Sequence, residues 1–295
     1  MTVPAISIIV PCYNGGRYLD ALLASIAAQT FRDFEIVIVD DGSTEQATLD
    51  KLASLDPGIR VVHQENRGLA AARNTGFREA RSDLVLPLDC DDQLAPSFLA
   101  ETHCLLTSAP DDVAFVFTHM RLVGARTGVR PCHFDRFDQL FLNDLPYGML
   151  IRKRAWEAVG GYDESMREGY EDWEFNIRVA ASGYRGIEVA KPLLIYHVSA
   201  SGMLISVSIP RHGALWRRIR DKHRDLFRPS ALLSQWRKRN EGTRKDGAGR
   251  ISLAAGTSLL LLASMLPEAW FGRLFHRALM TSRWWESRRR DAVAQ

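Results

Sequence analysis

The sequence has few cysteines and few long apolar runs, and both shortages limit the class of protein. Its four cysteines show no CxxC spacing and no dense framework, so free thiols in a cytosolic protein are the simplest interpretation. The chain starts almost directly with the apolar segment 6–10, without the basic region and apolar core of a signal peptide. The longest apolar run, 251–266, is shorter than the roughly 20 residues that span a bilayer, which favours an interfacial or core helix.

Two common nucleotide-binding signatures are also missing. No GxGxxG follows the first predicted strand, and no GxxxxGK[ST] occurs in the chain. These absences disfavour a Rossmann dinucleotide site and a P-loop.

Charge is distributed unevenly along the 295 residues. Residues 1–210 carry 19 Lys and Arg against 28 Asp and Glu, a net of −9, whereas residues 211–295 carry 19 against 7, a net of +12. The sum is the overall charge of +3. We therefore expect two regions with different tasks, an acidic region 1–210 that carries the chemistry and a basic region 211–295 that favours an anionic surface.

Apolar runs alternate with segments of helical periodicity over the first region. The strands are predicted at 6–10, 35–39, 60–63, 84–88, 113–120, 146–151 and 193–197, and 123–143 is predicted to be irregular. Helices are predicted between them, including 70–80, 96–106, 152–159 and 171–182. This alternation is typical of βαβ units and predicts an α/β fold with a doubly wound sheet.

Three loops at the predicted carboxyl edge of this sheet contain unusual residues. They are 11–14, 40–44 and 89–92, and ligands of such sheets bind at that edge. The acidic turn Asp89-Cys90-Asp91-Asp92 offers hard oxygen ligands for Mg²⁺ or Mn²⁺ carrying nucleotide phosphates. The alternative is a solvated turn that caps the next helix.

Six segments together resemble the inverting GT-A glycosyltransferases of family 2. The segments are SIIVPCYN at 7–14, VDDGS at 39–43, NRGLAAARN at 66–74, LDCDD at 88–92, GGYDE at 160–164 and EDW at 171–173. Each is weak alone, but their order is that of the family, and the likeness covers about residues 5–205. The resemblance implies a GT-A fold, which is Rossmann-like with a mainly parallel sheet flanked by helices.

The resemblance assigns the nucleotide-sugar donor to the first loops. The residues implied in donor binding are Pro11, Tyr13, Asp40, Asp41, Arg73 and Asp89. Tyr13 could stack on the base or pack as a turn aromatic, and Asp41 could accept the N3–H of uracil or shape its turn. Arg73 could face the diphosphate or lie on a solvated helix face.

The resemblance also implies a divalent metal ion, Mn²⁺ or Mg²⁺, at the DxD-like turn. Asp91 is the first choice as ligand, Asp89 lies nearer the ribose, and Asp92 is an alternative ligand. His197, at the end of the last predicted strand, matches a position where many members carry a metal or diphosphate ligand. It could instead be a plain hydrogen-bonding residue.

The expected catalytic base is Asp172. It would take a proton from an acceptor hydroxyl during a single in-line displacement, which inverts the anomeric centre. The alternative is a carboxylate stabilised by the helix dipole. Neighbouring Glu171 and Trp173 are acceptor-side candidates, and Trp173 could equally pack in the core.

The basic region 211–295 is not explained by the family. Tryptophans alternate with cations at 216–220, 236–239, 270–277 and 284–290. This pattern suits the surface of an anionic membrane, where lipid-linked acceptors would lie, whereas the alternative is a helical extension that packs on the first region. No nucleic-acid recognition motif is present, so nucleic acid is not expected as a partner.

The sequence therefore predicts a glycosyltransferase with domains at 1–210 and 211–295, cytoplasmic and peripheral on the membrane. A UDP-sugar donor, a glycan or lipid-linked glycan acceptor and a role in bacterial surface polysaccharide are expected from the resemblance. The alternatives are a sugar nucleotidyltransferase and a non-catalytic nucleotide-sugar-binding module. Acceptor choice is assigned to 123–147 and 161–170, and the sequence leaves the sugar, the linkage and the oligomeric state open.

Overall fold

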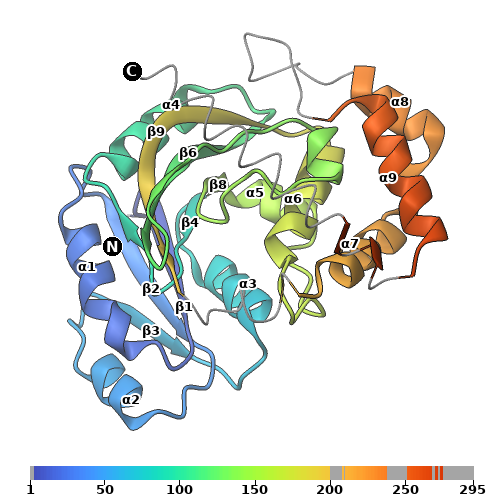
Figure 1. Cartoon of the computed structure of the whole chain (residues 1–295). Coiled ribbons are helices and arrows are strands. Elements are labelled where there is room, and N and C mark those ends of the chain that lie inside the picture. The colour runs from blue at the N-terminus through green and yellow to red at the C-terminus, as the bar shows by residue number, and fades with distance from the viewer. Residues whose placement is uncertain are drawn as a thin grey trace.

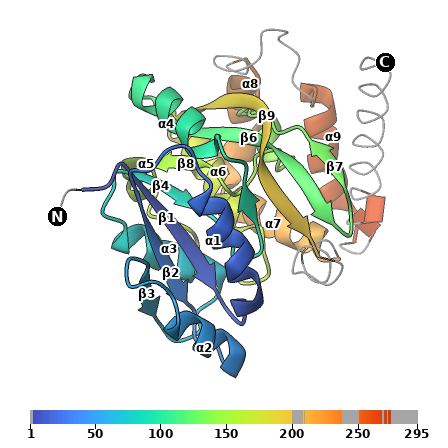
Figure 2. The same cartoon turned by 90° about the vertical axis from the view of Figure 1, so that its left-hand side faces the viewer.

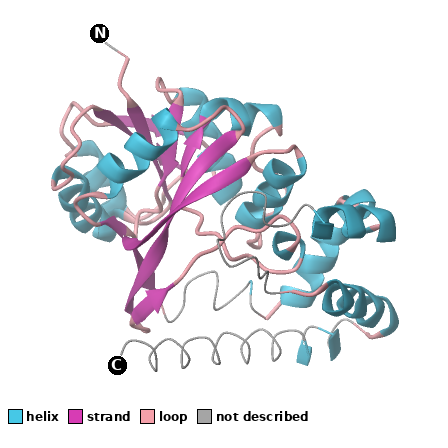
Figure 3. Ribbon diagram, turned by 90° about the horizontal axis from the view of Figure 1, so that it is seen from above, coloured by secondary structure: helices cyan, strands magenta, loops and turns pink. Residues whose placement is uncertain are grey.

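The computed structural model is built around one sheet of nine strands. It describes residues 3–199, 208, 210–237, 251–267, 270–271 and 273–274. The strand order is β3-β2-β1-β4-β8-β6-β9-β5, and β7 pairs with β6. Helices flank this sheet, which runs through the centre of the molecule (Figure 3). The predicted α/β fold is confirmed.

The first half of the sheet is parallel. It consists of β1 (Ile6–Cys12), β2 (Phe34–Asp40), β3 (Arg60–His63) and β4 (Leu84–Pro87). The helices connecting these strands are α1 (Leu19–Ala27), α2 (Gln46–Ala53) and α3 (Leu69–Glu79). All residues of β1 and β4 are buried, as their continuous apolar sequences predicted.

The second half of the sheet is mixed. It contains β5 (Gln93–Leu94), β6 (Val113–Gly124), β7 (Gly128–Arg130), β8 (Leu150–Arg152) and β9 (Arg185–Val198). Among the described strands, β8 is antiparallel to both β4 and β6, and β5 and β7 are antiparallel to their partners. The longest pairing of this half, between β6 and β9, is parallel. The expectation of a mainly parallel sheet is therefore confirmed, with short antiparallel pairings added in the second half.

Several predicted boundaries in the second half change. β9 begins at Arg185 rather than at 193, because its polar first part pairs with β6 and needs no apolar alternation. β7 lies inside 123–143, which was expected to be irregular, and β8 starts at Leu150 rather than at 146. The helices α4 (Phe98–Ser108) and α5 (Lys153–Ala158) lie within about two residues of their predicted bounds.

Helix α6 (Glu171–Ala181) precedes β9 in the chain and packs against the C-terminal extension. The extension contains α7 (His212–Lys222), the 3-10 helix Arg224–Phe227, α8 (Pro229–Arg237) and α9 (Leu253–Met265). These helices gather at the end of the molecule opposite α2 and β3 (Figure 1), and the turned view shows them behind β6 and β9 (Figure 2).

A second hydrophobic core joins the extension to the region before residue 210. It combines residues of both regions: Phe137, Leu140, Phe141, Met166, Trp173, Ile177, Trp216, Ile219, Phe227, Leu232, Ile251, Ala263 and Phe271. The indole N–H of Trp216 donates to the carbonyl of Leu140 at 3.0 Å. Packing of the extension on the first region, one of the two alternatives from sequence, is therefore present. The predicted Trp and cation cluster 284–290 lies outside the described residues, as do parts of the clusters 236–239 and 270–277.

Candidate active site

The three loops singled out from sequence lie at one edge of the parallel half-sheet. Cys12 of β1 pairs with Asp40 of β2, and Ile9 pairs with Pro87 of β4, so loops 11–14, 40–44 and 89–92 follow adjacent strand ends. The amide of Leu88 donates to the carbonyl of Ile9, which extends this alignment into the acidic turn. The convergence predicted from the order of strands is confirmed.

Asp40 and Asp41 are buried and hold the surrounding loops. Asp40 accepts the amide of Ser43 at 2.9 Å and lies 3.0 Å from the His63 ring. Burial alone would raise the pKa of Asp40, but hydrogen bonds from Ser43 and His63 outweigh it and lower this pKa. Asp41 accepts the side-chain amide of Gln64 and the backbone amides of Arg67 and Gly68. Both carboxylates thus fix the β2 and β3 loops around the edge.

The glycine after these aspartates has a specific structural reason. Gly42 has a φ of +72°, and a Cβ there would lie 2.8 Å from the amide of Asn66. Replacing it would push apart the loops that Asp41 holds together.

Tyr13 is the exposed aromatic residue of the first loop, and its side chain is 51% exposed. Pro11 before it is buried in β1, and Asn14 after it has a φ of +52°. The Asn14 side-chain carbonyl accepts the amides of Thr44 and Glu45, which ties this loop to the loop after β2. Tyr13 therefore projects from a loop that is fixed on both sides, and its ring is free to stack on a planar ligand.

The three aspartates of the acidic turn have different environments. Asp92 is 1% exposed, accepts the Tyr147 hydroxyl on Oδ2 and accepts the amide of His197 on Oδ1 at 2.7 Å. Burial, together with the charges of Asp91 and Asp89, raises the pKa of Asp92 well above its usual range. Both of its oxygens are engaged inside the protein, which opposes the expectation of Asp92 as an alternative metal ligand.

Asp91 is half-buried and forms no ion pair within the described part of the chain. Burial and the neighbouring charge of Asp89 raise the pKa of Asp91, so negative charge at this position is poorly compensated. A cation bound at Asp91 would provide that compensation.

His197 reaches the acidic turn because β9 returns beside β5. Gln93 of β5, directly after the turn, pairs with Ile195 of β9, two residues before His197. Nδ1 of His197 is buried and has no hydrogen-bond partner among the described residues. An unpartnered imidazole nitrogen beside an uncompensated carboxylate fits the donor set of a divalent cation.

No three His, Cys, Asp or Glu side chains lie close enough to enclose a metal ion, within the residues that the structure describes. Mg²⁺ in nucleotide sites uses one or two carboxylates together with substrate phosphates and water. The residues present therefore fit a cation that arrives with a diphosphate.

Arg73 of α3 links the acidic turn to α6. Its guanidinium is 2% exposed, donates to both oxygens of Asp89 at 2.8 and 3.0 Å, and donates to Glu171 at 2.5 Å. It also lies 5.0 Å above the ring of Tyr147. Burial would lower the pKa of Arg73, but the two carboxylates outweigh it and raise this pKa. Arg73 thus faces neither solvent nor an open site but joins the two acidic segments.

Glu171 is buried against Arg73. Burial raises the pKa of Glu171 to about 7, despite the favourable charge of Arg73, and the nearby Asp172 adds to this increase. Glu171, a candidate for acceptor binding from sequence, is therefore buried below the surface, where it forms an ion pair with Arg73.

Asp172 is half-buried at the start of α6. Its Oδ1 accepts the amide of Trp173 at 2.8 Å, and its Oδ2 accepts the side-chain amide of Asn143 at 2.9 Å. The residue before the motif, Tyr170, has a φ of +65°, which is uncommon for a residue with a side chain. Two donors and a strained backbone turn therefore fix the direction of the Asp172 carboxylate.

Trp173 belongs to the second core. It is 2% exposed, and its indole N–H donates to the carbonyl of Gln139 at 2.7 Å. Apolar groups of the extension, including Trp216, belong to the same core as Trp173. Core packing, the alternative left open from sequence, is what the structure has.

Sequence reasoning missed Tyr147 and Asn143. The Tyr147 hydroxyl donates to Asp92 and accepts the amide of Asp89 at 3.1 Å, so it fixes both ends of the acidic turn. Both residues come from 123–147, most of which was expected to be irregular because it has no periodic pattern. The only sequence indication was its assignment to acceptor choice.

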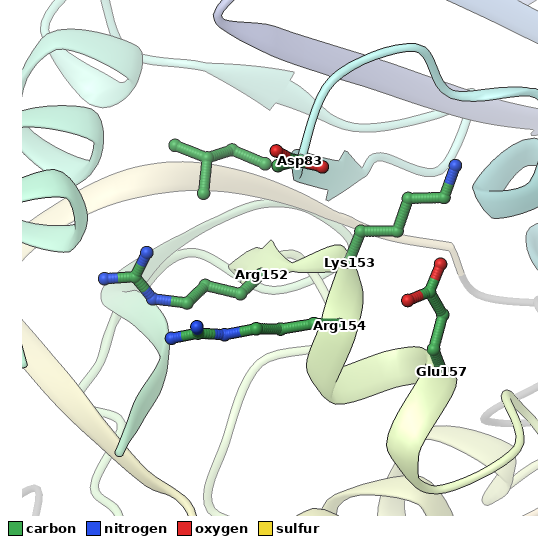
Figure 4. A pocket seen from close by; sticks show the side chains of 6 residues that line it. Asp83, Arg152, Lys153, Arg154 and Glu157 are labelled. Carbon is green, nitrogen blue, oxygen red and sulfur yellow. The ribbon is translucent and has the colours of Figure 1, made fainter. Parts of the chain in front are cut away.

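A cavity of about 230 Å³ lies elsewhere, at the opposite end of β4 (Figure 4). Asp83, Leu84, Arg152, Lys153, Arg154 and Glu157 line it. Arg152 and Lys153 donate to backbone carbonyls, and Arg154 pairs with Asp111. Its cations are thus committed to the fold, and the cavity is separate from the acidic turn, which follows the other end of β4.

Comparison with known proteins gives one family. The family model described as Glycosyl transferase family 2 matches residues 7–179. EpsH of Bacillus subtilis (strain 168), whose name describes a glycosyltransferase, is 36% identical over 225 residues, covering 69% of this chain and 64% of EpsH. The chain therefore spans slightly less than two thirds of that relative.

Solved structures with a similar fold are more distant in sequence. TarS of S. aureus, solved with UDP-GlcNAc, has a TM-score of 0.60 at 20% identity and covers 79% of this chain and 73% of its own. The mannosyltransferase PcManGT of Pyrobaculum calidifontis, solved with GDP-Man and Mn²⁺, has a TM-score of 0.54 at 20% identity. The match covers 97% of this chain and 88% of PcManGT. At these identities, the likeness concerns the fold.

Proposed function

The chain belongs to glycosyltransferase family 2, and from that premise we propose that it transfers a sugar from a nucleotide-diphosphate donor to an acceptor hydroxyl. The observation that carries this proposal is the position of Arg73. Its contacts with Asp89 and Glu171 bring the acidic turn next to Asp172. In this proposal, the turn that would accept the diphosphate lies beside the carboxylate that would take a proton.

The donor is proposed to bind at loops 11–14, 40–44 and 89–92, with a UDP-sugar as the first choice. The exposed Tyr13 would stack on the base. Pro11, Asp40 and Asp41 would form the fixed walls of the base and ribose site, and Asp89 would lie near the ribose. This role for Asp40 and Asp41 is supported by their contacts with the loop backbones.

A divalent cation, Mn²⁺ or Mg²⁺, is proposed to bind at Asp91 and His197 together with the donor. When bound, it would stabilise negative charge on the departing nucleotide diphosphate. The uncompensated charge of Asp91 and the unpartnered Nδ1 of His197 support this assignment. Asp92 is then a positioning residue that holds the amide of His197 and the hydroxyl of Tyr147.

Asp172 is proposed as the general base. Its carboxylate would accept the proton of the acceptor hydroxyl while the hydroxyl oxygen forms the new bond to the anomeric carbon and the bond to the diphosphate breaks. One displacement from the opposite face inverts that carbon. Asn143 would hold the carboxylate in position for this step.

The acceptor is proposed to be a glycan or lipid-linked glycan of a bacterial surface polysaccharide, at the cytoplasmic side of the membrane. The family and the basic extension support this setting. Segment 123–147 contacts Asp172 through Asn143, which supports the assignment of this segment to acceptor choice.

Isothermal titration with nucleotide diphosphates and nucleotide sugars, with and without Mn²⁺, tests the proposal. One nucleotide should bind in a metal-dependent manner, and Asp91→Ala should abolish that dependence. Asp111→Ala is the matched control, because Asp111 is exposed in a surface ion pair with Arg154. Failure of every nucleotide to bind would refute the donor site.

A further inference from the structure

Helix α9 presents an unusual surface in the extension. Its 13 residues, Leu253–Met265, include no charged side chain. The inner face packs through small residues: Gly256 and Ala263 are buried, and a Cβ on Gly256 would lie 2.9 Å from Phe141. One face of α9 therefore makes its contact with the second core.

Several large apolar side chains are exposed on α9 and at two of the described residues after it. Leu261 is 62% exposed, Met265 is 78% exposed, and Leu262 between them is also exposed. Further along, Trp270 is 65% and Leu274 is 49% exposed. We call these five residues the 261–274 surface. Residues 261 and 265 are one helical turn apart, as are 270 and 274 in sequence, so each pair shares a side of the chain.

This concentration of exposed apolar groups differs from the rest of the described chain. Elsewhere, the exposed large apolar residues are Val3, Tyr13, Val129 and Trp236, which are separate in sequence. Single exposed apolar residues are ordinary, whereas a cluster on a water-soluble surface marks a contact with another apolar phase.

Cations accompany the 261–274 surface. The guanidinium of Arg273 lies 5.0 Å from the centre of the exposed Trp270 ring, and that of Arg217 lies 5.3 Å from the Phe271 ring. Arg217 also donates to the carbonyl of Leu266 at 2.7 Å, at the end of α9. Residues 211–295 carry 19 Lys and Arg against 7 Asp and Glu. Aliphatic side chains with adjacent Trp and Arg match the boundary between the acyl chains and the head groups of an anionic bilayer.

The length of α9 defines the mode of contact. At about 1.5 Å per residue, a helix of this size measures roughly 20 Å, against about 30 Å for the bilayer core. Among the described residues, no helix has the length and hydropathy required to cross a membrane. The surface would therefore lie along the membrane.

We propose that the 261–274 surface docks on the head-group boundary of an anionic lipid bilayer, with Leu261, Met265 and Trp270 inserted among the lipids. This docking deepens the proposed function, because it would hold the enzyme where lipid-linked acceptors lie. It is a property of the extension, however, and its test uses no substrate of the enzyme.

The test is co-flotation of the full-length protein with vesicles of phosphatidylcholine alone or mixed with phosphatidylglycerol. The wild-type protein should float with the anionic vesicles, and high salt should weaken this binding. The double variant Leu261→Asp, Met265→Asp should lower the affinity at least about tenfold, because two inserted side chains would carry charge. The control is Val129→Asp, an apolar-to-acid change at a 56% exposed position on β7, outside the 261–274 surface.

Three results would overturn the proposal. The first is no preference of the wild-type protein for anionic vesicles. The second is unchanged binding of the double variant while circular dichroism shows it folded. The third is a dimer, seen by light scattering, that the double variant dissociates while vesicles bind neither protein, which would make this surface a contact between two copies. Trp270→Ala, which adds no charge, should lower the affinity less than the double variant.

Discussion

The two sides of the proposed site are held in different ways. On the donor side, loops 11–14, 40–44 and 89–92 follow strands paired in the parallel half-sheet, and contacts such as Asp41 with Gly68 connect neighbouring βα units. On the acceptor side, the start of α6 is fixed by residues from distant parts of the chain. Asn143 contacts Asp172, and Gln139 contacts Trp173.

This difference indicates that donor binding and acceptor positioning are separable. The donor side is supported by the first core, whereas α6 on the acceptor side contributes to both cores. Phe175 belongs to the first core, and Trp173 belongs to the second, which also includes Trp216 and Phe271 of the extension. Arg73 joins the two sides through its contacts with Asp89 and Glu171, and Tyr147 adds hydrogen bonds to the acidic turn. Variants on either side, or at this junction, should therefore give distinct combinations of binding and turnover.

The largest effect is expected from Asp172→Asn, which should lower turnover without changing donor binding. An amide of the same shape cannot take the acceptor proton, so turnover should fall about 10²- to 10⁴-fold. The donor dissociation constant should stay within about twofold, because the loops of the donor side are untouched. Titration and turnover of the same preparation check this, and equal loss of both would contradict the separation.

Arg73→Met should damage both sides together. The change leaves Asp89 and Glu171 without their cation in a buried place, which we expect to cost about 3–5 kcal/mol of unfolding free energy. Donor binding should weaken as well as turnover. Denaturant unfolding and donor titration measure the two effects.

Arg154→Met is the control for this variant. Its ion pair with Asp111 is exposed, so it should cost less than about 1 kcal/mol. A stable Arg73→Met protein with normal donor affinity would show that Arg73 does not join the two sides.

Glu174→Gln should loosen the acceptor side alone. Burial would raise the pKa of Glu174, but hydrogen bonds from His223, Arg178 and Lys222 outweigh it and lower this pKa to about 2. His223 and Lys222 belong to the end of α7, so Glu174 ties α6 to the extension. Loss of its charge should cost about 2–3 kcal/mol, since Lys222 is partly exposed and its share is screened.

The same carboxylate predicts an acid dependence of stability. Because the folded pKa is below the usual 4.5, its contribution is fully present above about pH 4.5 and is lost as the pH falls from there towards about 2. Unfolding of the wild type and of Glu174→Gln at several pH values should converge over this window. A constant difference between them would assign the stabilisation to another group.

Asn143→Ala is expected to have the smallest effect. It tests how strongly turnover depends on the orientation of the Asp172 carboxylate. Without the Asn143 amide, Asp172 keeps one of its two described donors, and turnover should fall about tenfold, about 1.4 kcal/mol, with donor affinity unchanged. Asn143→Asp, which keeps the shape and loses the donor, should be no better. Restoration by Asn143→Gln would confirm a positioning role, and normal turnover of the alanine variant would refute it.

The sequence alone determined the strands and loops of the donor side. Continuous apolar runs such as 6–10 predict buried parallel strands, and the residues that follow them must meet at one edge because parallel strands share a direction. The position of Asp89–Asp92 could therefore be inferred without long-range contacts. The motifs around Gly42 and Gly68 likewise reflect local backbone requirements, with φ values of +72° and +89°.

Tertiary structure decided which carboxylates are engaged and which are open. Asp91 and Asp92 are adjacent and chemically identical, yet Tyr147 and the amide of His197 engage only Asp92. Trp173 and Arg73 are buried because the extension and α6 cover them, and no local pattern encodes that cover. Long-range packing sets burial and charge pairing, so the sequence could name these residues while the fold alone assigned their roles.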